Sequence, residues 1–63
     1  MDIAAELAAR DMSVNVYIRA DSVHVTLIKP NGNWAAKSVI PQQPAIFALI
    51  KHEIERLLEG YNE

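Results

Sequence analysis

The sequence predicts one small α+β domain over residues 1–63, with both helices on one face of a three-stranded antiparallel sheet. Three observations predict this helix–strand–strand–strand–helix order. Apolar residues recur with a helical period at both ends of the chain. Between the ends the period changes to two, which is typical of strands. Short turn sequences separate the strands, and strands joined in this way pair antiparallel. Each helix is therefore expected to pack on the apolar side of the sheet.

The composition excludes several classes of protein. The chain has 63 residues, a formal net charge of −2 and no cysteine, so neither disulfides nor cysteine-bound zinc can stabilise it. With 51% hydrophobic residues it is too apolar for a disordered chain. No apolar run comes near the roughly 18 residues of a membrane span, and we expect no secretory signal. We therefore expect a cytoplasmic domain without a membrane segment.

The short length also predicts self-association. A domain of about 60 residues buries only about 60% of its unfolded surface. Disulfides and cysteine-bound metals are not available here, so association with a second copy or with another protein is the remaining source of stability. A homodimer is the simplest form that we expect.

Residues from Asp2 to about Asp11 are expected to form the first helix. Asp2 can accept hydrogen bonds from the free amides of the first turn, and its charge suits a helix N-terminus. Ile3 and Leu7 lie four residues apart and therefore on one face. The alanines around them favour helix and allow close packing. Because a helix this short does not persist alone in water, it must pack on the rest of the domain.

Three strands follow, and each alternates apolar with polar residues. The first begins at Ser13, and its apolar side carries Val14, Val16, Ile18 and Ala20. Asp21-Ser22 is the expected turn. The apolar side of the second strand carries Val23, Val25 and Leu27. The third strand spans Trp34–Ile40, after an Asn31-Gly32 turn that predicts a hairpin because both residue types tolerate positive φ.

Two-residue loops at both turns would put the same apolar set on one face of the sheet. The first loop predicts the pairs Ala20 with Val23, Ile18 with Val25, and Val16 with Leu27. The second predicts the pairs Leu27 with Ala36, Val25 with Ser38, and Val23 with Ile40. The alternative for the second hairpin is a three-residue loop with a glycine bulge, which would move Trp34 to the other face.

The second helix is expected to start with Pro44 in its first turn, to run to about Glu59, and to use Gly60 as its C′ residue. At 100° per residue, one continuous apolar stripe contains Ile46, Phe47, Ile50, Ile54, Leu57, Leu58 and Tyr61. Leu49 lies outside this stripe, and Lys51 and Glu55 form an i,i+4 pair on the solvent side. The stripe is expected to pack on the sheet.

The face of the sheet away from the helices is the predicted partner-binding surface. In the preferred register it shows Asn15, Tyr17, Arg19, His24, Thr26, Ile28, Ala35, Lys37 and Val39. Aromatic residues and arginine are enriched at recognition surfaces, and a fully solvated face has little need of apolar side chains. The candidate partner-binding residues are Tyr17, Arg19, His24, Ile28, Lys37 and Val39. Trp34 is expected to cover the edge of the core, with an interface anchor as the alternative.

Motifs for catalysis are nearly missing from the sequence. His52-Glu53-Ile54-Glu55-Arg56 begins like the zinc helix H-E-x-x-H, but Arg56 stands where the second histidine ligand belongs. Ser13, Ser22 and Ser38 belong to no nucleophile motif, and two glycines cannot build a phosphate-binding loop. We therefore expect a protein that is not an enzyme and that holds no cofactor and no metal.

The charges separate along the chain. Residues 13–40 carry three cations and one carboxylate, whereas the segments before and after them are each acidic. The two helices should therefore be acidic and the sheet mildly basic. Mimicry of nucleic acid by the acidic helices is a third, weaker hypothesis, because Lys51 and Arg56 interrupt the glutamates of the last segment.

These features favour a small protein-binding module that acts by steric occupation of a partner surface. An inhibitor, an adaptor or a regulatory accessory protein would act in this way, and small cysteine-free proteins of this size class are common among accessory factors of bacteria and their phages. The surface could be the sheet face, the acidic helix face, or an edge strand that pairs with a second copy.

A weak nucleic-acid-binding module is the alternative function. The element order is similar to that of the double-stranded-RNA-binding domain, along the whole chain. That family contacts phosphates with a basic cluster at the start of its last helix. Here that stretch reads Gln42, Gln43, Pro44, Ala45, and the first cation is Lys51. Nucleic acid would then depend on the mildly basic sheet face, through Tyr17, Arg19 and Lys37.

Overall fold

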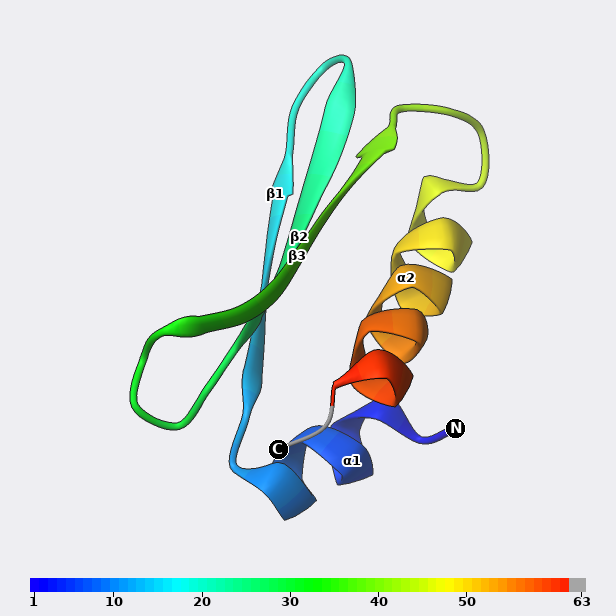
Figure 1. Ribbon diagram of the computed structural model, residues 1–63. Coiled ribbons are helices and arrows are strands. Elements are labelled where there is room, and N and C mark those ends of the chain that lie inside the picture. The colour runs from blue at the N-terminus through cyan, green and yellow to red at the C-terminus, as the bar shows by residue number, and fades with distance from the viewer. Residues whose placement is uncertain (62–63) are drawn as a thin grey trace.

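Two helices pack on one face of a three-stranded antiparallel sheet (Figure 1). The computed structural model describes residues 1–61. In chain order the elements are α1 (Ile3–Arg10), β1 (Ser13–Ile18), β2 (Ser22–Ile28), β3 (Trp34–Pro41) and α2 (Ile46–Gly60). The predicted fold class is confirmed, including the antiparallel sheet and the order of its elements.

Helix α1 begins and ends as its sequence predicts. The Asp2 carboxylate accepts a hydrogen bond from the backbone amide of Ala5 at 3.2 Å, so it caps the first turn. At the other end Asp11 adopts the left-handed conformation with φ 54°. The amide of Met12 then donates to the carbonyl of Leu7 at 3.0 Å, which closes the helix and directs the chain into β1.

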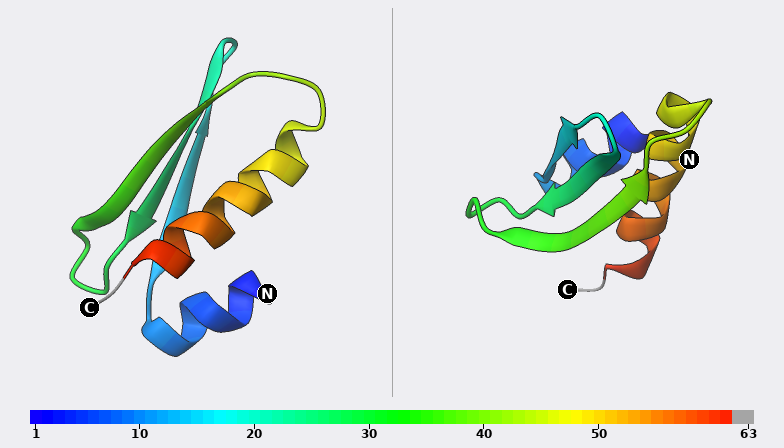
Figure 2. Two further views of the ribbon diagram at one scale, coloured as in Figure 1. Left: turned by 45° about the vertical axis from the view of Figure 1, so that its right-hand side comes forward. Right: turned by 90° about the horizontal axis from the view of Figure 1, so that it is seen from above.

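The central strand β2 supplies the middle of the core. Its side chains alternate between buried and half-buried, and Val23, Val25 and Leu27 are at most 1% exposed. Leu27 packs with Met12 and Leu58, whereas Val23 and Val25 pack with Ile50. Helix α2 lies across β2 and β3, and α1 lies beside the C-terminal end of α2 (Figure 2).

The predicted register of β1 against β2 is wrong by two residues, although the predicted faces are right. Ile18 pairs with Val23, Val16 with Val25 and Val14 with Leu27. The amide of Arg19 donates to the carbonyl of Ser22 at 2.8 Å, so the two-residue loop is Ala20-Asp21 and Ala20 is not in the strand. A shift of two residues keeps every side chain on its own side of the sheet, so alternation alone could not reveal it.

The register of β2 against β3 is confirmed for Val23, Val25 and Leu27, which pair with Ile40, Ser38 and Ala36. The predicted Asn31-Gly32 loop is wrong. The amide of Gly32 donates to the carbonyl of Lys29 at 2.9 Å, and the amide of Lys29 donates to the carbonyl of Asn33 at 2.8 Å. These bonds describe a type I turn with Gly32 at φ 90°, in a three-residue loop.

The extra loop residue changes the first residues of β3. A register shift follows Leu27, so that Ile28 pairs with Trp34 and Ala35 has no cross-strand partner. Trp34 therefore lies on the face away from the helices, as the bulged alternative requires. Ala35 lies instead against the core cluster of Met12, Leu27 and Leu58, so its predicted place on the open face is wrong.

Helix α2 starts and ends slightly later than expected. Its first residue is Ile46, after Ala45 in the left-handed conformation with φ 62°, and Pro44 precedes the helix. Gly60 is the last helical residue and does not have the positive φ of a C′ glycine. The expected pairing of Lys51 with Glu55 is replaced by an ion pair in which Glu55 lies 3.7 Å from the N-terminal ammonium group.

The apolar stripe of α2 is confirmed except at Phe47. Ile50 and Leu58 are buried, and Ile54, Leu57 and Tyr61 pack against the core. Phe47 is 75% exposed. At 100° per residue, the Phe47 side chain leaves the axis of α2 in nearly the same direction as that of Leu58, about three turns further along the helix. Helix α1 has 8 residues and covers this direction only near Leu58, so the first turn of α2 is left uncovered.

Candidate partner-binding surface

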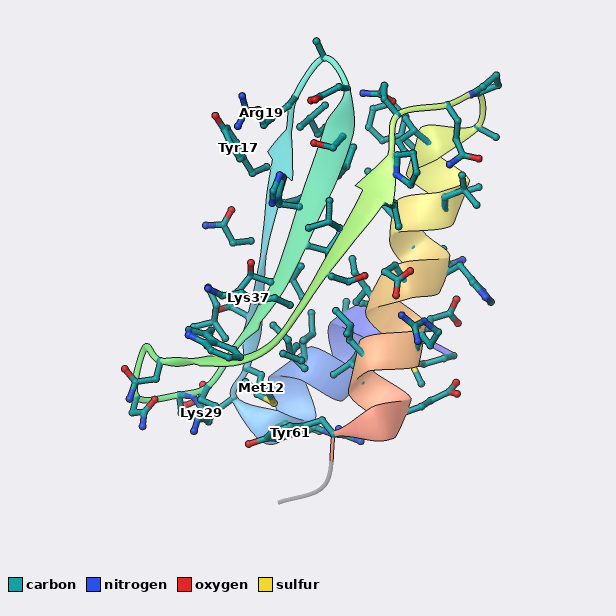
Figure 3. All side chains as sticks on the ribbon, turned by 45° about the horizontal axis from the view of Figure 1, so that its top comes forward. Met12, Tyr17, Arg19, Lys29, Lys37 and Tyr61 are labelled. Atoms are coloured by element: carbon teal, nitrogen blue, oxygen red, sulfur yellow. The ribbon has the colours of Figure 1, made fainter. Side chains whose placement is uncertain are left out.

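One face of the sheet is free of both helices (Figure 2). It carries large exposed side chains. We call it the open face. The pairing aligns its residues in rows across the strands, namely Tyr17–His24–Val39, Asn15–Thr26–Lys37 and Ser13–Ile28–Trp34. Figure 3 shows Tyr17, Arg19 and Lys37 on this side, whereas Met12 and Tyr61 lie on the side of the helices.

The first group on the open face surrounds Tyr17. Its ring centroid lies 5.8 Å from that of His24 on the neighbouring strand, with the two rings tilted by 45°. The guanidinium carbon of Arg19 lies 5.9 Å from the centroid of the Tyr17 ring, within cation–π distance. Tyr17 is nevertheless 57% exposed, so most of the ring is available to a partner.

The second group consists of Trp34 and Lys37 on β3. The ammonium nitrogen of Lys37 lies 4.6 Å from the centroid of the Trp34 ring. Trp34 is 58% exposed, so the expectation that it covers the edge of the core is wrong. The signal for its true position was Pro30, because proline at the second position of a type I turn followed by Asn31 and Gly32 favours the bulged loop.

No strand residue on the open face is acidic. Arg19 and Lys37 are its cations, and Asp21 is the only acidic residue between Ser13 and Pro41. Asp21 lies in the turn, where its carboxylate accepts a hydrogen bond from the Ser22 hydroxyl at 3.2 Å. The glutamates of α1 and α2 belong to elements on the opposite side of the sheet.

The structure brings all six candidate residues to this one face. Tyr17, Arg19, His24 and Val39 lie at the end near the first turn, and Val39 is 59% exposed. Lys37 and Ile28 lie in the next two rows, beside Trp34. Ile28 is only half-buried, which leaves part of its side chain in solvent. Trp34 is the functional candidate that the preferred register missed.

The described residues contain neither a cluster of metal-ligating side chains nor a helix that could span a membrane. Over residues 1–61, no group of three or more histidine, aspartate or glutamate side chains is placed to hold a metal ion. Neither described helix has the length and apolar character needed to cross a bilayer. His24 and His52, the two histidines, belong to different elements, β2 and α2.

No protein-family model, no curated protein and no solved structure matches this chain. The functional argument therefore depends on the geometry of the surface.

Proposed function

We propose that this protein is a non-enzymatic protein-binding module whose open face docks on a partner protein and blocks or bridges the surface that it covers. One observation carries the proposal, namely that Tyr17, Trp34 and Val39 are each more than half exposed on a single helix-free sheet face. Tryptophan, tyrosine and arginine are enriched among the few residues that supply most of the binding energy in protein interfaces. Self-association is part of the proposal, as the short chain favours it.

The chemistry of the open face specifies the partner. Arg19 and Lys37 flank the exposed aromatic rings, and the strands place no carboxylate among them. A complementary surface would present aliphatic or aromatic side chains bordered by carboxylates. Such complementarity fixes orientation and accelerates encounter more than it adds affinity.

A matched set of variants tests this proposal. The immobilised wild-type chain, the double variant Tyr17→Ser/Trp34→Ser and the control Phe47→Ser are compared for capture of partner protein from nuclease-treated lysate of the source cells. Phe47 is a suitable control because it is an exposed aromatic residue on the other side of the molecule. We expect the same protein to bind wild type and the control but not the double variant. Equal capture by all three chains would contradict a role for the open face.

A second candidate function is binding of single-stranded nucleic acid. It is favoured by the two exposed rings that share the open face with Arg19 and Lys37, since stacking platforms combine aromatic rings with cations. With two cations on the face, binding would be weak and strongly salt-dependent. A gel-shift assay at low salt, with Arg19→Glu/Lys37→Glu as the comparison, tests it. Binding that the double variant loses would place this function above protein docking.

A further inference from the structure

The two edges of the sheet differ in how they are protected from pairing with another strand. Edge strands in soluble proteins are usually protected by charged residues, proline or a bulge. Edge strand β3 has all three, in Lys37, Pro41 and the bulge at Ala35. Edge strand β1 has none, because Ser13–Ile18 contains no charge and no proline and pairs with β2 without a register shift. Strand β1 is therefore the edge that is open to a further strand.

The hydrogen-bond phase of the hairpin shows which backbone groups lie at this edge. The amide of Arg19 points toward β2, where it donates to the carbonyl of Ser22. In an antiparallel ladder this direction alternates, so Tyr17, Asn15 and Ser13 also point their backbone groups toward β2. The N–H and C=O groups of Val14, Val16 and Ile18 consequently point away from the sheet. They form an unpaired row along the outer edge of β1, which is one of the two edge strands of the described sheet.

The side chains of the same row leave apolar surface uncovered. Val16 is 37% exposed and Ile18 is 49% exposed, although both belong to the helix side of the sheet. Helix α2 lies over β2 and β3, and α1 lies near the Ser13 end of β1. A strand added beside β1 would bring its own side chains against Val16 and Ile18.

We propose that β1 pairs antiparallel with β1 of a second copy, about a two-fold axis at Val16. Val16 then lies opposite Val16 of the second copy, and Val14 lies opposite Ile18 of the second copy. Every outward-pointing N–H and C=O of this row gains a partner in this register. This proposal rests on the self-association that is part of the proposed function. It deepens that function by naming the surface through which two copies associate.

The edge suits a second copy better than a different protein for two reasons. The row Val14, Val16, Ile18 is self-complementary in the antiparallel sense, so the same residues serve both sides of an isologous contact. The strand carries no charge, so two copies meet without like-charge repulsion, despite the net charge of −2. A charged partner would find no complementary group on β1.

Dimerisation would also enlarge the open face. Tyr17 would lie opposite Asn15 of the second copy on that face, and the two three-stranded sheets would become one continuous sheet of six strands. Both aromatic and cationic groups would then be present twice on one surface. A partner with repeated or two-fold symmetric features would bind such a surface with higher avidity than one copy allows.

One substitution at the edge and one away from it test the proposal. Val16→Lys places two ammonium groups against each other at the two-fold axis. Phe47→Lys is the control, because Phe47 is an apolar side chain that is 75% exposed on α2, and α2 lies over β2 and β3. Light-scattering mass is measured over a concentration series. We expect twice the 7.0 kDa chain mass for wild type and Phe47→Lys, and one chain mass for Val16→Lys. A monomeric wild type, or a Val16→Lys variant that remains a dimer, would overturn the proposal.

Amide hydrogen exchange of the wild-type chain, followed residue by residue by NMR, removes any dependence on variants that fail to fold. The amides of Val14, Val16 and Ile18 should become protected as the concentration rises, while those of Asn15 and Tyr17 are protected throughout. Protection that does not depend on concentration would refute the β1 contact. Because neither measurement uses a partner protein, their outcome is independent of the capture experiment on the open face.

Discussion

The guanidinium group of Arg10 donates a hydrogen bond to the backbone carbonyl of Leu58 at 3.1 Å. The bond joins the last turn of α1 to the last turns of α2, and its acceptor is the carbonyl of a residue whose side chain is fully buried in the core. The same carbonyl also accepts from the backbone amide of Tyr61 at 3.3 Å, so Arg10 supplies a second donor at the C-terminal end of α2.

Replacing Arg10 by alanine should therefore weaken the contact between the helices. Hydrogen bonds to charged groups contribute about 1.5–3 kcal/mol, and the partial exposure of Arg10 lowers the expected loss below this range, to about 1 kcal/mol. Urea denaturation measures the free energy of unfolding. Arg56→Ala is the control, because Arg56 pairs only with Glu53 among the described side chains, on the surface of α2, and should change stability by less than about 0.5 kcal/mol.

Leu58 and Phe47 should respond differently to truncation although both belong to the apolar stripe of α2. Leu58 is 0% exposed, so Leu58→Ala removes buried methyl groups and leaves a cavity, at an expected cost of about 2–5 kcal/mol. Phe47 is 75% exposed, and Phe47→Ala should cost less than about 1 kcal/mol. Thermal denaturation of both variants measures the contrast. A large loss for Phe47→Ala would mean that this side chain is covered in solution.

The two glycines should respond with opposite signs to replacement by alanine. Gly32 has φ 90° with no atom near the site of an added Cβ, so Gly32→Ala costs only the strained backbone, about 1–2 kcal/mol. Gly60 lies in the last turn of α2, also with open space around it. Gly60→Ala should stabilise the chain by up to about 1 kcal/mol, because alanine favours helix. Melting temperatures of the two variants should therefore move in opposite directions.

The N-terminal cap of α1 should be measurable in the same way. The Asp2 carboxylate satisfies the amide of Ala5, so Asp2→Ala should cost about 1 kcal/mol. Asn at this position keeps an oxygen acceptor, and Asp2→Asn should retain most of the stability. If both variants lost the same amount, the charge of Asp2 rather than its hydrogen bond would be the stabilising feature.

Trp34 gives a direct optical probe of the open face, because it is the only tryptophan of the chain. Its exposure of 58% predicts efficient quenching of fluorescence by acrylamide in the free protein. Binding of a partner on the open face should reduce this quenching. Dilution of the chain through the proposed dimer transition should leave it unchanged, because Trp34 lies on β3, at the far edge from β1. A concentration-dependent change would place the dimer contact on the open face instead.

Much of the candidate surface could be predicted from alternation along the strands. A period of two assigns each side chain to one side of the sheet, and for Tyr17, Arg19 and His24 this assignment holds despite the shifted register. The preferred register places Trp34 on the wrong face, because one unpaired residue at Ala35 moves the side chains of the preceding strand residues to the opposite face of the sheet. The bulge depends on the number of residues in the loop that contains Pro30. Alternation along the strands does not determine that number.

The sequence by itself determined the order of the elements, their antiparallel connection and the sides on which most strand residues lie, since these follow from short-range periodicity, capping and turn chemistry. Only the tertiary structure decided which apolar residues remain in contact with water. Phe47, Val16 and Ile18 have the pattern of core residues, but the eight-residue α1 does not extend far enough to cover any of them. Their exposure depends on how far one element extends over another, and no local pattern contains that distance.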